Sequence, residues 1–321
     1  MNSENPGSTP GVMAALTGGF ELATSHIWLI VLPIALDLLY WLGPRLQVDE
    51  LLTRTIAALE ADVGQIAFVE QSVSMAPQVN LLSTLSLPLI GVPTLMGGPI
   101  PELTPLTTSA VQIDSMSTWM ILYLALSVVG LLLASVYLGS VGWMLHAREK
   151  PDSVGPLYFI RRVIRQATRL FGAVLVFLLL LITVCLPLMP IAIVLSLIGA
   201  GGLALLVLLL GLVLLVIYMS MVVPSLMYAE LPVVEAVMHS LRLVHRYRLQ
   251  TALLLFTILI VNMGLDSLWQ MADYGTWLTL ASVAAHAFVS TGLVAALFLF
   301  YRDRAELLER PIQRASARPA D

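Results

Sequence analysis

Long apolar stretches separated by short polar segments form the main pattern of this chain. A helix that crosses a bilayer needs about 20 mostly apolar residues, because the hydrocarbon core is about 30 Å thick and each residue adds about 1.5 Å. Stretches that meet this requirement lie at about 27–43, 117–145, 170–195, 203–228, 249–269 and 276–301. The pattern predicts an all-α polytopic transmembrane helix bundle of about six spans.

Glycine and proline mark the expected breaks between and within these spans. Residues 170–229 carry no charged side chain and are too many for one crossing, and Gly199 and Gly201 near their middle predict a tight hairpin. Because proline lacks a backbone N–H, we expect Pro187 and Pro190 to disturb the end of the third span. For the same reason, Pro33 predicts a kink in the first span.

Amphipathic segments precede the first, third and fifth spans, at 12–22, 157–165 and 234–246. We expect each to be an elbow helix at the cytoplasmic interface that leads into a two-span hairpin, which gives three hairpins. Two interpretations stay open, a threefold parallel repeat and three independent elbows; the slight identity among the segments favours the second. Arginines on the second and third elbows predict contact with anionic lipid headgroups.

One long insertion, residues 44–116, separates the first two spans. Its first half predicts an amphipathic helix over 49–75, with an apolar stripe at Leu52, Ile56, Leu59, Val63 and Ile66. This helix either packs on the bundle at the interface, which is the simpler reading, or binds a protein partner or a second copy of the chain. The second half, 78–116, is apolar but contains five prolines, so we expect a re-entrant or surface-hugging loop.

Composition excludes several classes of protein. The chain has 321 residues, of which 59% are hydrophobic and 11% are charged, whereas soluble domains carry roughly 25% charged residues. A soluble enzyme and a disordered chain are therefore excluded. The net charge of −4 gives no basic surface for nucleic acid. With Cys185 as its one cysteine, the chain cannot form an internal disulfide, and no motif indicates a cofactor or a metal.

The distribution of basic residues predicts the orientation. Of the 16 lysines and arginines, 14 fall in 148–169, 242–248 and 302–318, on one side of the predicted bundle. The positive-inside rule then places both termini in the cytoplasm and the 44–116 insertion outside, within a single integral membrane domain over 1–321 that ends in a cytoplasmic tail at 302–321. One observation disagrees, because residues 1–26 contain no lysine or arginine.

Ionisable residues inside the predicted spans are the candidate functional residues, because burying one at the bilayer centre costs at least about 2.5–3.5 kcal/mol. Asp37 lies ten residues into the first span, which places it about 15 Å deep. His286 lies at a similar depth in the sixth span, on one helix face with Ser282 and Ser290. Asn262 and Asp266 share a face of the fifth span.

These residues admit three interpretations. The favoured one is structural: polar groups buried between helices satisfy one another and make packing specific. In the second, Asp37 and His286 exchange protons along a solute or proton path, which requires their side chains to lie within about 10 Å of each other. The third, an intramembrane enzyme, is disfavoured because the chain has no zinc-protease, serine-hydrolase or phosphate-loop motif.

One segment carries a family resemblance. The sequence Leu231-Pro232-Val233-Val234-Glu235-Ala236, followed by Ser240, Leu241, Leu243 and an apolar span, resembles the membrane domain of some bacterial glycerophosphoryl diester phosphodiesterases and related six-helix membrane proteins. The resemblance covers about the last 100 residues, includes no catalytic domain, and implies architecture without activity. With the apolar spans, it implies a location in the bacterial cytoplasmic membrane.

The sequence favours a non-enzymatic multi-pass membrane protein with a role in membrane interaction, assembly or envelope maintenance. The alternative is a transporter or permease for a small or lipidic solute, using Asp37 and His286. A water-lined cavity at these residues would favour transport, and a dry, close-packed interior would favour the first function.

Overall fold

The computed structural model describes residues 11–51, 53–55, 80–87, 90–98, 104–106, 108–147, 156–269 and 274–316. Helices long and apolar enough to span a membrane occur here in five places: α5 (Met116–Ala147), α6 (Pro156–Leu197), α7 (Gly201–Met219) with α8 (Val222–Met227), α10 (Arg248–Trp269) and α11 (Thr279–Ser316). They match the second to sixth predicted spans. The protein is an all-α membrane protein, as its apolar pattern predicts.

The first predicted span and its elbow are two helical segments that meet at a sharp bend. Helix α1 (Val12–Ser25) is followed by the 3₁₀ turn η1 (Ile27–Ile30) and by α2 (Val31–Leu42), and the two arms meet at 91°. The bend lies before Pro33 and not at it. Pro33 occupies the first turn of α2, where proline is tolerated because the first N–H groups of a helix have no partner within it.

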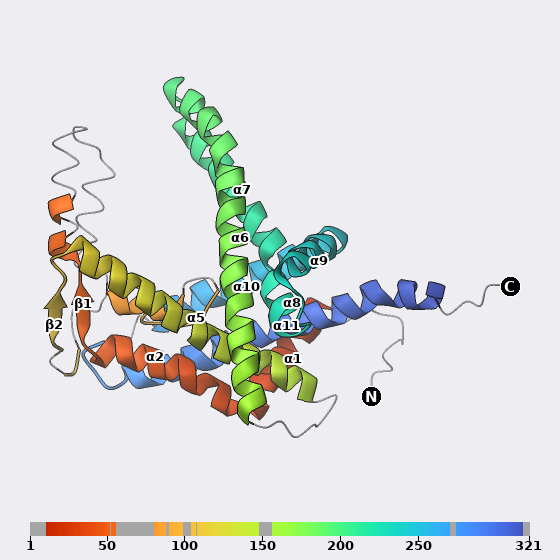
Figure 1. Cartoon of the computed structure of the whole chain (residues 1–321), viewed down its shortest axis with the longest axis horizontal. Coiled ribbons are helices and arrows are strands. Elements are labelled where there is room, and N and C mark those ends of the chain that lie inside the picture. The colour runs from red at the N-terminus through yellow and green to blue at the C-terminus, as the bar shows by residue number, and fades with distance from the viewer. Residues whose placement is uncertain are drawn as a thin grey trace. The chain divides into compact units, whose positions relative to one another are not determined.

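Helices α6 and α7 form the predicted hairpin, and the part of α6 near the turn lies beside α7 (Figure 1). The turn contains Gly199 at a φ of +79°, a conformation that glycine adopts without strain. Tight packing within the hairpin occurs at Gly211, where an added Cβ would come within 2.7 Å of Leu188. Large outward side chains such as Leu186 and Leu205 are more than two-thirds exposed, as suits contact with lipid.

One expectation for α6 is wrong. The predicted elbow at 157–165 is not a separate helix, because α6 runs unbroken from Pro156 to Leu197. Pro187 and Pro190, expected to disturb the end of the third span, lie inside this helix and do not end it. No glycine or proline lies between the elbow and the span to break the helix, and within a membrane helix neighbouring groups and local adjustments accommodate proline.

Helix α9 (Val233–Arg246) is the predicted third elbow. Its buried face carries Ala236, Ser240, Leu243 and Val244, while its basic residues lie on the other side. Tyr247 leaves helical geometry and separates α9 from α10. The predicted tail begins inside α11, which continues to Ser316, and Arg304 is buried there over the rings of Phe300 and Tyr247.

The insertion contains a small sheet that the helical pattern did not predict. Strand β1 (Arg45–Gln47) pairs in parallel with β2 (Ala110–Gln112), so the two ends of the insertion meet. Asn80, which precedes the 3₁₀ helix η3 (Leu81–Ser86), accepts hydrogen bonds from the backbone of Leu46 and Leu82. Of the predicted 49–75 helix, residues 49–51 and 53–55 are helical, and 56–75 lie outside the described residues.

Contacts divide the chain into two compact units, which are described separately. Unit 1 comprises residues 1–20, 141–260 and 293–321. Unit 2 comprises residues 21–140 and 261–292 and includes α2, the insertion and the sixth-span polar residues.

Candidate functional site

Asp37 in unit 2 is fully buried and holds a loop of the insertion. Its Oδ1 atom accepts a hydrogen bond of 2.8 Å from the backbone N–H of Met96, and the amide of Leu95 also interacts with the carboxyl group. The other oxygen, Oδ2, has no hydrogen-bond partner among the described residues. A carboxyl group inside a helix bundle thus ties down backbone from a distant segment.

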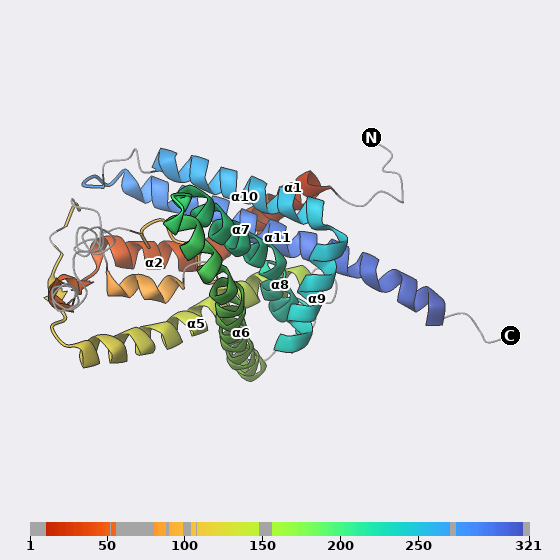
Figure 2. The same cartoon turned by 90° about the horizontal axis from the view of Figure 1, so that it is seen from above.

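The same loop packs on α5. An added Cβ at Gly130 would come within 2.9 Å of the Leu85 carbonyl oxygen and 3.0 Å of that of Thr84, so only glycine admits this approach without a shift. Gly130 lies 14 residues into α5, about 21 Å along the helix. In Figure 2, η3 lies between α2 and α5. The described parts of this loop, residues 80–87 and 90–98, therefore lie beside the middle of two predicted spans.

Tyr40 lies one helical turn after Asp37 and shares its surroundings. Its hydroxyl group lies near Ser86, but its oxygen forms no hydrogen bond of ordinary geometry within the described chain. Ser86 donates its own hydrogen bond to the Ser83 carbonyl oxygen at 2.8 Å. One oxygen of the Asp37 carboxyl group and the Tyr40 hydroxyl thus lack a hydrogen bond of ordinary geometry within the described residues.

The end of α2 is anchored to the segment that leads into α11. Trp41 is fully buried, and its Nε1–H donates a 3.0 Å hydrogen bond to the carbonyl oxygen of Tyr274. Its ring also meets that of Trp277 edge-on, with centroids 5.9 Å apart. These contacts fix the helix turn next to the one that carries Asp37.

The predicted polar stripe of the sixth span is present on α11. Ser282, His286 and Ser290 are all buried, and the Ser290 hydroxyl donates to the His286 carbonyl oxygen at 2.7 Å. Next to this stripe, the Tyr137 hydroxyl of α5 donates a 3.0 Å hydrogen bond to Thr291 Oγ1. Sequence reasoning missed both partners of this bond, and the signal was available, since a hydroxyl inside an apolar helix needs a partner.

The hydrogen bond of Asp37 goes to the Met96 backbone and not to His286. Proton exchange between Asp37 and His286 therefore stays a prediction. Asn262 lies half-buried on α10, and the side chain of Asp266 lies outside the described part of the chain. Among the described residues, no three His, Cys, Asp or Glu side chains gather as a metal site requires.

Unit 1 contains a cluster of opposite charges on the basic end of α6. Glu230 accepts from Arg162 at 3.0 Å and from Arg165 at 3.4 Å, and its carbonyl oxygen accepts from Arg169. Arg162 is buried and stacks over the ring of Trp143, 4.6 Å from its centroid. Arg162 and Arg165, two of the arginines expected to contact lipid headgroups, bind the Glu230 carboxylate, which joins α6 to the segment before α9.

No protein-family model matches this chain, and no curated protein or solved structure matches it. The function is therefore argued from the residues of the chain itself.

Proposed function

We propose that this protein is a non-enzymatic multi-pass membrane protein that acts in membrane interaction, assembly or envelope maintenance. It resides in the bacterial cytoplasmic membrane with both termini in the cytoplasm. The observation that supports this function best is the hydrogen bond between Asp37 and Met96, because it gives the intramembrane acid a structural task.

The energetics of the loop support a structural role for Asp37. At membrane depth, backbone N–H groups have no water to bind, so an irregular loop there needs partners from the protein. Asp37 supplies an acceptor to Met96, and the loop in turn supplies donors that reduce the cost of burying a carboxyl group, at least about 2.5–3.5 kcal/mol. Each group thus compensates the other, as expected of a residue that maintains the fold.

Charge distribution and resemblance support the location. The Glu230 cluster gathers the arginines of α6 on the side that the positive-inside rule assigns to the cytoplasm. The resemblance of the last hundred residues to a phosphodiesterase-associated membrane domain fits a membrane module that carries no catalytic group of its own.

A transporter for a small or lipidic solute is the alternative. Two polar atoms that form no hydrogen bond within the described residues favour it, Oδ2 of Asp37 and the hydroxyl oxygen of Tyr40, because each could take part in proton transfer. In this case Asp37 and His286 would serve as successive proton carriers.

A proton-flux measurement separates the two functions. The protein is reconstituted in phosphatidylcholine vesicles that contain a pH-sensitive dye, and a pH gradient and a membrane potential are imposed. For the structural function we expect wild type, Asp37→Asn and the exposed-residue control Asp114→Asn to leak no faster than empty vesicles. Flux above empty vesicles that Asp37→Asn abolishes and Asp114→Asn retains would overturn the proposal.

The interaction or assembly role needs a separate measurement. Nanodiscs excised from native membranes by polymer retain the neighbours of a membrane protein, and mass photometry gives the mass of each particle. We expect particles heavier than one 34.8 kDa chain in its lipid disc. A population of single chains alone would contradict association.

A further inference from the structure

Helix α9 has one face buried in unit 1 and one basic face. On the buried side, the Ser240 hydroxyl donates a 2.7 Å hydrogen bond to the carbonyl oxygen of Tyr218, which ties α9 to the end of α7. Arg242, His245 and Arg246 are exposed on the other side. Their spacing of three and four positions places them along one helix face.

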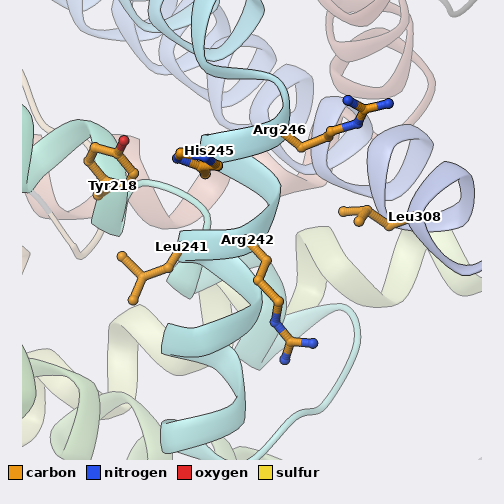
Figure 3. A pocket seen from close by; sticks show the side chains of 6 residues that line it. All are labelled: Tyr218, Leu241, Arg242, His245, Arg246 and Leu308. Atoms are coloured by element: carbon orange, nitrogen blue, oxygen red, sulfur yellow. The ribbon is translucent and has the colours of Figure 1, made fainter.

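An open groove of about 520 Å³ lies over this basic face. It is lined by Tyr218, Leu241, Arg242, His245, Arg246 and Leu308. In Figure 3, Tyr218 and Leu241 lie to one side of α9 and Leu308 lies to the other, while the two arginine side chains extend in different directions from the helix. The groove surface is therefore almost wholly apolar, and the charged groups of Arg242 and Arg246 extend away from each other on the helix that it follows (Figure 3).

The positive charge of this groove is not neutralised by the described part of the chain. No acidic residue lines it, and within the described residues neither Arg242 nor Arg246 forms an ion pair with a carboxylate. The Nε of Arg242 donates to the Met238 carbonyl oxygen at 3.2 Å, which fixes the stem and leaves both Nη groups for a ligand. On α6, by contrast, Arg162 and Arg165 already share Glu230.

The position and chemistry of the groove point to one kind of occupant. Arginine binds phosphate oxygens through two parallel hydrogen bonds, a geometry that lysine cannot provide. Apolar walls suit the glycerol and upper acyl carbons of a lipid, and a tyrosine ring is favourable at the level of the headgroups. The third elbow is also the element expected to lie at the cytoplasmic interface, where anionic lipids attract basic segments.

We propose that the α9 groove is a binding site for an anionic phospholipid. Arg242, whose Nη groups are not bound within the described residues, binds the headgroup phosphate, Arg246 and His245 add positive charge on the same helix, and Leu241, Tyr218 and Leu308 contact the apolar part of the lipid. The inference rests on the membrane location in the proposed function and adds a specific ligand class.

Lipid binding to the purified protein tests this site. Native mass spectrometry of the detergent-solubilised chain, titrated with phosphatidylglycerol or phosphatidylcholine, gives a dissociation constant for each lipid. We expect phosphatidylglycerol to bind at least tenfold more tightly than phosphatidylcholine. In the double variant Arg242→Gln/Arg246→Gln this preference should fall to twofold or less; both side chains are exposed, so the fold should persist.

The matched control removes two exposed arginines that lie outside the groove and outside the elbow segments, in Arg54→Gln/Arg248→Gln. We expect it to keep the preference of wild type. An equal loss in both double variants would mean that overall charge attracts the lipid, and would overturn the site. Glycerol 1-phosphate, a soluble compound with the same phosphate chemistry, is titrated in the same way. If it binds as tightly as phosphatidylglycerol, the groove is a site for a soluble phosphate compound, and the proposal of a lipid site is overturned.

The lipid-binding test can overturn the groove site without overturning the proposed function, and the proton-flux test can do the reverse. Proton flux is measured in phosphatidylcholine vesicles, where no anionic lipid is present. A lipid preference that survives Arg242→Gln/Arg246→Gln removes the groove site and leaves the structural role of Asp37 untouched.

Discussion

Asp37 and Met96 are joined by a 2.8 Å hydrogen bond from the Met96 amide to Asp37 Oδ1, across 59 positions of sequence. This bond makes a helix residue and a loop residue mutually dependent at membrane depth, because neither the carboxyl group nor the amide has water there to replace its partner. The bond explains why an acid is present in an otherwise apolar helix, and it defines the first prediction.

Replacing Asp37 should destabilise the protein only when the acceptor is lost. Asp37→Ala leaves the Met96 amide without a partner, and we expect the free energy of unfolding to fall by about 1–3 kcal/mol. Asp37→Asn keeps an oxygen at the same place and should remain closer to wild type. Tryptophan-fluorescence melting of the detergent-solubilised protein measures both. Equal losses for the two variants would show that charge, and not the acceptor, is what the loop needs.

Gly130 and Gly264 form a matched pair for testing the packing of the loop. A Cβ at Gly130 would press on the carbonyl oxygens of Leu85 and Thr84, whereas one at Gly264 on α10 meets nothing within 4 Å. We expect Gly130→Ala to destabilise the protein by about 1–3 kcal/mol through overpacking. Gly264→Ala should instead stabilise α10, by about 0.5–1 kcal/mol. A neutral Gly130→Ala variant in the same melting assay would argue against close packing of the loop on α5.

Loss of the Glu230 carboxylate should leave the buried positive charge of Arg162 without its partner. Arg162 is only 6% exposed and depends on Glu230, which is itself 32% exposed. Breaking a buried pair costs about 3–5 kcal/mol, and partial exposure of Glu230 reduces our expectation for Glu230→Gln to about 1–2 kcal/mol. Urea titration monitored by fluorescence provides the measurement.

The control for Glu230 is Glu50→Gln, which breaks the exposed pair of Glu50 with Arg54. We expect a change of at most about 0.5 kcal/mol from this variant, because exposed helix pairs contribute little. A Glu230→Gln variant as mild as this control would contradict the role given to the cluster.

Tyr137 and Thr291 should be energetically coupled. Their buried hydrogen bond joins α5 to α11 within unit 2, so removing either hydroxyl leaves the other without this partner. We expect Tyr137→Phe and Thr291→Val each to cost about 1 kcal/mol, and the double variant to cost less than their sum by about 0.5–1.5 kcal/mol. A double-mutant cycle in the melting assay measures the coupling, and strictly additive losses would rule it out.

The sequence alone predicted the elements that depend on local pattern. The spans that became α5, α7–α8, α10 and α11 and the helix α9 all follow from hydropathy and helical period. Lipid satisfies an apolar helix surface without help from the rest of the chain, so runs of about 20 apolar residues are sufficient to place a span.

Partner choice between distant residues depended on tertiary structure. No local pattern pairs Asp37 with Met96, Glu230 with Arg162, or Tyr137 with Thr291, because these contacts join segments that are 59 or more positions apart. The parallel strands β1 and β2 were missed for the same reason. A strand of three residues is too short to show an alternating pattern, and the pair forms only when the ends of the insertion meet. Hydropathy determines which residues leave water, and packing determines which buried polar groups find each other.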